Sequence, residues 1–326
     1  MTAMPIRSRT LFLLGATAAS LVVSLFQSQF NAYYYQIIIY AGINIILASS
    51  LNLVNGFTGQ FSLGHAGFMA VGAYTAAVVT SELGVTGGIA GAFVFLLALL
   101  CGALVASFFG LLVGIPSLRL RGDYLAIVTL GFGEIIRVII QNLDFLGGAR
   151  GFTGIAKVTN FFWVFTAVAV LLFLLSNLIR STYGKGFLAV RDDEIAAEAM
   201  GINTTRYKVI AFVAAAFFAG LAGGLYGHFV TYLNPSQFGF VKSIEIVVMV
   251  IVGGMGRHVG VLVSAVLLTV LPEALRPIAE YRMVIYSLML VVIMIARPQG
   301  VFGNGDFLKK MIEAVGRRAK SGEARS

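Results

Sequence analysis

Apolar residues along the chain form successive blocks, each close to the roughly 20 residues that a helix needs to cross a bilayer. These blocks predict spans at 11–26, 33–54, 66–83, 88–115, 123–142, 161–179, 208–228, 243–256, 260–275 and 283–296. The estimate is about ten spans and no fewer than eight, because the segments around 55–70 and 243–275 can each be broken or re-entrant. The alternating strands of a membrane β-barrel are not seen. The pattern therefore predicts an all-α, polytopic integral membrane bundle.

Composition supports this fold class. Of the 326 residues, 59% are hydrophobic and 11% are charged, whereas a soluble domain has about 25% charged residues. The single cysteine, Cys101, rules out a disulfide framework within the chain. A net charge of +9 would suggest nucleic acid as the partner of a soluble protein. In a membrane protein it indicates Lys and Arg retained on the cytoplasmic side, so membrane lipid and not nucleic acid is the expected partner.

The basic residues also predict the orientation. Arg7 and Arg9 precede an apolar run that resembles a signal peptide, but no small-residue cleavage site follows, which indicates a retained first span. Most of the 23 Lys and Arg residues fall on the side that holds both termini, and Lys242 is counted among the few outside. Both termini are therefore expected to be cytoplasmic.

Residues 1–306 are expected to form one transmembrane domain, with a cytoplasmic loop at about 180–207. Residues 307–326 are expected to form a basic cytoplasmic tail. Its apolar residues fall on one helical face, which suits a helix lying on the anionic inner leaflet. A frayed basic tail is the alternative.

The stretch "NGFTGQFSLGHAGFMAVGAY", residues 55–74, carries glycines and polar side chains between two apolar blocks. Small residues let membrane helices approach closely, and non-helical backbone at membrane depth must be buried or line a water-filled cavity. We therefore expect a broken or re-entrant segment at 55–65 and a closely packed helix at 66–83. The candidates to line a translocation pathway are Asn52, Asn55, Gly56, Gly59, Gln60, Ser62 and His65. The alternative is that these groups only hydrogen-bond neighbouring helices.

Other glycines indicate packing. Gly220/Gly224 and Gly223/Gly227 each form a G-x-x-x-G pair in the span at 208–228. The three histidines fall in separate segments without the spacing of metal ligands, so no metal site is expected.

One charged pair falls inside a predicted span. Glu134 and Arg137 are three residues apart, with Gln141 one turn further on the same face. An unpaired charge near the bilayer centre costs about 2.5–3.5 kcal/mol on insertion scales, and pairing offsets part of that cost. The pair is either a structural ion pair or part of the translocation pathway.

The most informative loop is "RDDEIAAEAMGINTTRYKV", residues 191–209. Asp192, Asp193 and Glu194 favour a helix start, the run that follows has high helix propensity, and Gly201 is placed to end the helix. A helix of about ten residues is marginal alone in water, so it must pack against its own membrane domain or another protein. It is either a docking element or a plain connection between spans.

The segment "AAEAMG" resembles the core of the EAA loop, which permeases of ATP-binding-cassette importers present to their ATPase subunits. Ile195 stands where that motif has its Glu, and Glu194 lies one residue early. Together with "NLVNGFTGQFSLGHAGFMAVGAYTAA", "VVMVIVGGMGRHVG" and "RPQGVFG", the chain over about 35–303 resembles the branched-chain amino-acid permease family, in its LivM-type branch.

That resemblance implies a permease of the bacterial inner membrane that imports leucine, isoleucine and valine. It implies a LivH-type second permease, two cytoplasmic ATPase subunits and a periplasmic solute-binding protein as partners. It also assigns ATPase coupling to the loop residues Asp192, Asp193, Glu194, Ala196, Ala197, Glu198 and Gly201.

The chain itself carries no G-x-x-x-x-G-K-[ST] phosphate loop, since Gly184-Lys185 is followed by Gly186 and lacks the upstream glycine. It is therefore expected to bind no cofactor, with ATP and Mg²⁺ on the partner ATPases, and to have no catalytic residues of its own. Two alternatives stay open. Related permeases handle urea, short amides or other amino acids. An ion-coupled secondary transporter would favour buried Asp, Glu or His relays, for which Glu134 is the clear candidate within a span.

Overall fold

The computed structural model describes residues 6–25, 31–84, 88–118, 120 and 122–276, together with isolated positions between 281 and 295. Within these residues the chain is helical apart from loops and one isolated antiparallel bridge between Phe152 and Leu233. The α-helices are α1 (Ile6–Leu25), α2 (Ala32–Asn52), α3 (His65–Leu83), α4 (Ile89–Ser117), α5 (Asp123–Gln141), α6 (Phe161–Arg180), α7 (Thr182–Asp192), α8 (Glu194–Ala199), α9 (Thr204–Val230), α10 (Phe240–Gly253) and α11 (His258–Ala274). The short elements are the π-turn η2 (Leu53–Phe57) and the 3-10 turns η3 (Asp144–Leu146), η4 (Gly148–Arg150) and η5 (Pro235–Phe238).

Six stretches are long and apolar enough to cross a membrane, which confirms an all-α, multi-pass membrane protein. They are Ala32–Phe57, His65–Leu83, Ile89–Ser117, Phe161–Arg180, Thr204–Val230 and Pro235–Gly253. The predicted count of about ten is not confirmed. The predicted spans at 11–26, 123–142 and 260–275 are helical as α1, α5 and α11 but are not among these six. The predicted span at 283–296 falls largely outside the described residues, and the tail at 307–326 lies outside them entirely.

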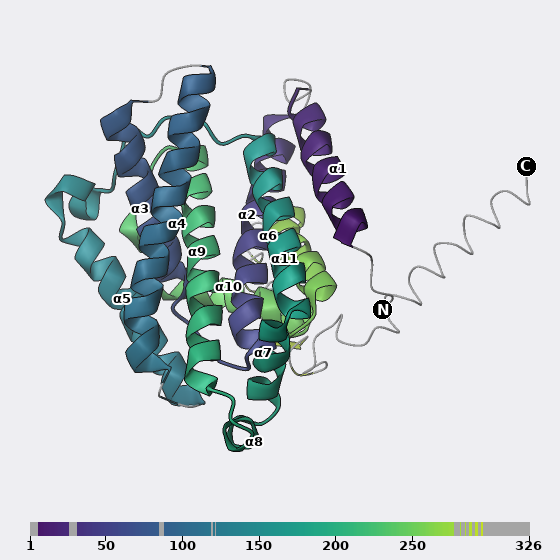
Figure 1. Ribbon diagram of the computed structural model, residues 1–326. Helices are drawn as coiled ribbons and strands as arrows, with labels where there is room; N and C mark the ends of the chain where they lie inside the picture. The colour runs from purple at the N-terminus through teal and green to yellow at the C-terminus, as the bar shows by residue number, and fades with distance from the viewer. Residues whose placement is uncertain are drawn as a thin grey trace, which may run out of the picture.

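Helices α3, α4 and α9 form the tightly packed centre of the bundle (Figure 1). Glycines bring their backbones together: a Cβ added at Gly72 would stand 2.2 Å from the Cα of Gly220, and one at Gly102 would stand 2.6 Å from the carbonyl oxygen of Gly72. A Cβ at Gly223 would meet the carbonyl oxygen of Met69. Small residues therefore hold this core together, as predicted for helices that associate without a hydrophobic driving force.

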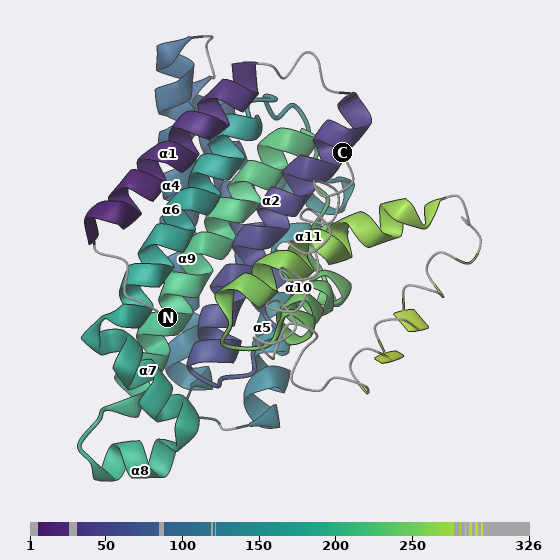
Figure 2. The same cartoon turned by 90° about the vertical axis from the view of Figure 1, so that its right-hand side faces the viewer.

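The remaining helices pack around this centre (Figure 2). Helix α2 lies against α6, α9, α10 and α11, while α1 packs on α6 at the outside of the bundle. The exposed surface of α4 consists of large apolar side chains such as Leu104 and Phe108, which suits a lipid-facing helix.

The predicted break at 55–65 is present. Helix α2 passes into the π-turn η2 and then into a non-helical stretch before α3 begins at His65. Helices α2 and α3 thus run in opposite directions from one turn. In Figures 1 and 2 that turn lies at the same end of the bundle as α7 and α8.

The connection from α9 to α10 is also irregular. It carries η5, and α10 begins at Phe240, so Lys242 lies within the candidate span Pro235–Gly253. The predicted span at 243–256 is thus present as α10, but the helix begins three residues earlier, at Phe240.

Candidate functional site

The glycine-rich turn and the α7–α8 connection meet at one end of the bundle. Gly59 has a φ of +69°, and a Cβ placed there would lie 2.9 Å from Cγ of Arg191. We call this meeting point the loop junction: the turn 52–65, residues 191–194, and the turn 254–257 between α10 and α11. Two residue sets predicted separately from the sequence, one for a pathway and one for coupling, thus share one site.

Arg191 and Asn52 connect the three parts of the loop junction. The Arg191 guanidinium donates from Nε and Nη2 to Oδ1 of Asp192, at 3.1 and 2.9 Å, and its Nη1 lies 3.5 Å from the carbonyl oxygen of Gly56. The Oδ1 atom of Asn52 accepts a hydrogen bond from the backbone N–H of Gly256 at 2.8 Å. The end of α7, the end of α2 and the α10–α11 turn are therefore linked by two side chains.

The polar side chains of the turn differ in how well they are satisfied. Asn55 Oδ1 accepts from the backbone N–H of Ser62 at 3.2 Å, and His65 Nε2 lies 2.9 Å from Ser50 Oγ. Gln60 is 4% exposed, and neither atom of its amide has a partner among the described residues. The first two contacts hold the turn together, whereas Gln60 presents an unused donor and acceptor.

Gln60 lines a cavity of about 410 Å³ at the loop junction. The cavity is bounded by Thr58, Gly59, Gln60, Phe61, Leu120, Gly122, Asp123, Leu125, Val190, Arg191, Asp192, Asp193, Glu194 and Lys208. A cavity this large, with polar groups in its walls, is suited to hold water. The α7–α8 connection and the glycine-rich turn both contribute to its walls.

The helix predicted from the acidic run is present as α8. Helix α7 ends at Asp192, and Asp193 is extended, with φ −158° and ψ 111°, while its Oδ1 accepts from the N–H groups of Ile195 and Ala196 at 2.9 and 3.0 Å. The predicted helix of about ten residues is therefore shorter, with six residues in α8, and a separate helix, α7, precedes it. Asp193 forms the break because an N-cap residue leaves helical geometry.

Helix α8 is fastened to α9 at both ends. Lys208 Nζ donates to Glu194 Oε1 at 2.6 Å, and the Lys208 side chain is only 6% exposed. Thr204 Oγ1 donates to Glu198 Oε1 at 2.7 Å. Between them Gly201 takes a φ of +83°, the left-handed conformation that favours glycine. Both ends of α8 are therefore bonded to the first turns of α9.

The outer surface of α8 is apolar in part. Ile195 is 68% exposed and Met200 82% exposed, and Ala196 is exposed beside them, while Ala197 is buried against the protein. Exposed apolar side chains grouped on a short element are typical of a protein contact.

Glu134 and Arg137 lie elsewhere, between α5 and the start of α10. Arg137 Nε donates to Glu134 Oε2 at 2.6 Å, and its Nη1 donates to Gln141 Oε1 at 3.4 Å. The other carboxylate oxygen of Glu134 accepts from the backbone N–H of Phe240 at 2.9 Å. The predicted ion pair is formed, and it also caps α10, which the sequence alone did not indicate.

Sequence analysis missed Lys208 and Arg191 as parts of the loop junction. Lys208 follows Glu194 by 14 residues, so no helical spacing rule connects them. A second ion pair, Lys242 with Glu245, was also missed, although the two residues are three apart in α10. Lys242 Nζ lies 3.1 Å from Glu245 Oε2 and 3.4 Å from Oδ1 of Asn44 in α2.

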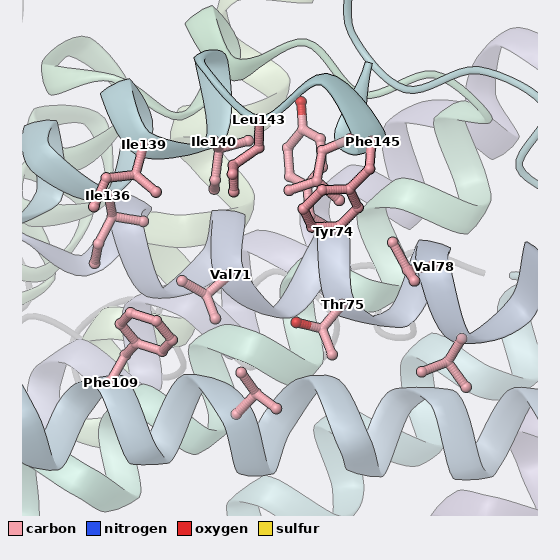
Figure 3. A pocket seen from close by; sticks show the side chains of 13 residues that line it. Val71, Tyr74, Thr75, Val78, Phe109, Ile136, Ile139, Ile140, Leu143 and Phe145 are labelled. Carbon is pink, nitrogen blue, oxygen red and sulfur yellow. The ribbon is translucent and has the colours of Figure 1, made fainter. Parts of the chain in front are cut away.

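A separate apolar cavity of about 270 Å³ lies between α3, α4 and α5 (Figure 3). Valine, isoleucine, leucine and phenylalanine side chains form most of its walls. Tyr74, which lines it, donates its hydroxyl to the carbonyl oxygen of Leu233 at 3.1 Å. This cavity offers no charged partner for the ends of an amino acid.

No group of three His, Cys, Asp or Glu side chains that could hold a metal ion occurs among the described residues.

The chain resembles known transport permeases. Residues 33–295 match the family model described as branched-chain amino acid transport system / permease component. The chain is 37% identical to the high-affinity branched-chain amino acid transport system permease protein LivM of Salmonella typhimurium and 36% identical to that of Escherichia coli. Both matches cover 79% of this chain and 67% of the relative. The Salmonella typhimurium permease protein LivH of the same system is 25% identical, over 81% of this chain and 92% of that protein. No solved structure matches the chain.

Proposed function

The chain belongs to the family of branched-chain amino acid transport permeases, and from this premise we propose that it is the permease subunit of an ATP-driven importer of leucine, isoleucine and valine. It is a transport subunit and not itself an enzyme. The substrate class rests on the LivM relatives, which are named for branched-chain amino acids and match most of the chain.

The observation that carries the ATP-driven mechanism is the attachment of α8 to α9. The exposed apolar side chains of Ile195 and Met200 offer a contact for a partner. The buried Lys208–Glu194 ion pair fixes the same short helix to the base of a span. A push on α8 by an ATPase subunit would therefore reach α9 directly.

A second connection leads from the same loop to α2, α3, α10 and α11. Arg191 packs against Gly59 and approaches Gly56, so movement of α7 would alter the turn that joins α2 to α3. The cavity of about 410 Å³ beside Gln60 gives that turn room to shift. In this proposal Asn52, Gln60 and Arg191 act at the inner end of the pathway as parts of a hinge.

The assembly proposed around the chain has a second, LivH-type permease, in keeping with the similarity of this chain to LivH as well as LivM. Two ATPase subunits bind at α8 on the cytoplasmic face, and a periplasmic solute-binding protein delivers the amino acid. The chain then lies in the bacterial inner membrane with both termini in the cytoplasm. The ATPase subunits carry ATP and Mg²⁺.

The direct test is uptake by the assembled transporter in proteoliposomes, with radiolabelled leucine, isoleucine or valine outside and ATP inside. We expect ATP-dependent uptake that the solute-binding protein stimulates, and no uptake of urea or acetamide. Uptake of urea or acetamide in place of the amino acids would refute the substrate. Uptake without ATP hydrolysis would refute the mechanism.

One observation favours the ion-coupled alternative. Lys242 and Glu245 form a second ion pair, in α10, in addition to the Glu134–Arg137 pair in α5. The chain reconstituted alone, with a proton or sodium gradient and no ATPase, distinguishes the two mechanisms. We expect no accumulation of leucine under those conditions.

A further inference from the structure

Two charged pairs lie near the middle of the bundle, well away from the loop junction. Glu134 is the twelfth of the 19 residues of α5, and its neighbour Gly133 faces Gly67 of α3, where an added Cβ would be 2.9 Å away. Lys242 reaches Asn44, which is near the middle of the candidate span Ala32–Phe57. At 1.5 Å per residue, Asn44 is more than about 10 Å from either end of that span, and Glu134 is about 10 Å from the nearer end of α5.

We call Glu134, Arg137, Lys242 and Glu245 the mid-depth charges. They flank the first turn of α10: an added Cβ at Gly239 would touch both Glu134 and Arg137, and the backbone N–H of Lys242 donates to the carbonyl oxygen of Gly239 at 3.1 Å.

The mid-depth charges are not shielded from their surroundings. The side chains of Glu134 and Glu245 are each 35% exposed, and those of Arg137 and Lys242 are 26% and 21% exposed. Charged groups at this depth are costly in hydrocarbon and face protein or water. The exposed face of α4, in contrast, is apolar at Leu104 and Phe108. The apolar face of α4 suits lipid, so the surface that carries the mid-depth charges does not face lipid as well.

The irregular connection before α10 supports the same assignment. Ser236 and Gln237 are exposed between the end of α9 and Phe240, within the candidate span Pro235–Gly253. Pro235 and Phe238 are buried and hold the segment against the bundle. Non-helical backbone at membrane depth is tolerated where it is buried in protein or lines a water-filled cavity. This face therefore meets water or a second protein.

Resting on the proposed function, we propose that the mid-depth charges line the water-filled route and bind the two charged ends of a free, zwitterionic amino acid. Arg137 and Lys242 are the partners for its carboxylate, and Glu134 and Glu245 are the partners for its ammonium group. In the substrate-free state each charge is neutralised by the other member of its pair. A ligand with both charges replaces those contacts without leaving an unpaired ion.

This assignment separates the amino acids from the other candidate substrates. Urea and short amides carry no charges to exchange with the ion pairs, so a route built for them has no need of two acids and two bases at this depth. The exposed apolar side chains of Phe240 and Val241, beside the mid-depth charges, suit the aliphatic side chain of the substrate.

The first test neutralises each pair in the assembled transporter, with Glu134→Gln/Arg137→Gln and Lys242→Gln/Glu245→Gln as separate double variants. Each keeps hydrogen-bonding groups and the net charge. We expect ATP-dependent leucine uptake to fall at least tenfold in variants that still fold in detergent and assemble with the ATPase subunits. The control, Asp144→Asn/Arg150→Gln, removes one acid and one base from exposed loop positions and should leave uptake unchanged. Wild-type uptake in either folded mid-depth variant would overturn the proposal.

The second test needs no transport. In a Cys101→Ala background, Val241→Cys and Leu104→Cys are exposed to a hydrophilic maleimide in the assembled transporter. We expect rapid labelling at position 241, slowed by leucine but not by urea, and little labelling at position 104. Equal, slow labelling at both positions would overturn the water-filled route. If the wild-type transporter imports no branched-chain amino acid, the proposed function fails. The labelling result still shows whether the protein surface around Val241 is accessible to water.

Discussion

Lys208 Nζ lies 2.6 Å from Glu194 Oε1, across the junction between the six-residue helix α8 and the long helix α9. The pair is formed on the cytoplasmic side of our proposed orientation, with the lysine almost fully buried and the glutamate partly exposed. The ion pair connects α8 rigidly to the span α9. A helix of six residues is not stable on its own, so it needs such a contact to keep its position.

Lys208→Met should weaken this connection. The variant leaves the Glu194 carboxylate without its lysine partner, at a cost of about 1–3 kcal/mol, and frees α8 from α9. We expect ATP hydrolysis to continue while leucine uptake per ATP falls several-fold, measured in proteoliposomes. Lys185→Met, at an exposed position of α7, is the matched control and should transport normally. Full coupling in Lys208→Met would contradict a mechanical role for the pair.

Gly201 should accept asparagine but not valine. Its φ of +83° costs most L-residues about 1–2 kcal/mol, and asparagine tolerates this conformation better than a β-branched residue. No atom lies within 4 Å of an added Cβ, so backbone strain and not crowding decides the result. We expect Gly201→Val to lose coupled uptake and Gly201→Asn to keep most of it. Equal activity of the two variants would show that the turn geometry is unimportant.

Arg191→Lys should loosen the loop junction although it keeps the charge. The guanidinium contacts Asp192 through two nitrogens while a third approaches Gly56, and a lysine ammonium cannot reproduce that geometry. We expect reduced uptake at unchanged basal ATP hydrolysis, and faster proteolysis of the α7–α8 loop in detergent. Arg206→Lys, an exposed substitution in the first turn of α9, provides the comparison. If both variants show the same uptake and the same rate of proteolysis, Arg191 has no special role in the proposed hinge at the loop junction.

Gly72→Ala should destabilise the core of the bundle. The added methyl would stand 2.2 Å from the Cα of Gly220, so α3 and α9 must separate, at a cost of about 1–3 kcal/mol or more. Gly131→Ala meets no atom within 4 Å and should be neutral or stabilising by about 0.5–1 kcal/mol. Thermal unfolding of the purified protein in detergent measures both, and an unchanged midpoint for Gly72→Ala would refute the close contact.

Much of the helix content could be read from the sequence because hydrophobic blocks of bilayer length leave few alternatives to a spanning helix. The break after α2 was also predictable, since glycines and polar groups at membrane depth are unfavourable in a plain lipid-facing helix. The start of α8 followed from Asp193, and its end from Gly201, because capping depends on residues close in sequence. The family could be recognised for the same reason, from motifs that are continuous in the chain.

The tertiary structure decided which of these residues meet. Lys208 and Glu194, Arg191 and Gly56, and Lys242 and Asn44 are separated by 14, 135 and 198 residues, and no periodicity relates members of such pairs. It also placed Lys242 in the first turn of α10, within reach of Glu245 and of Asn44 in α2. Hydropathy measures how well a segment suits lipid. The position of a buried charge in a helix bundle depends instead on the partner groups that helix packing brings next to it. The sequence thus determined the helices and the family, and only the packing of those helices determined where the charges lie.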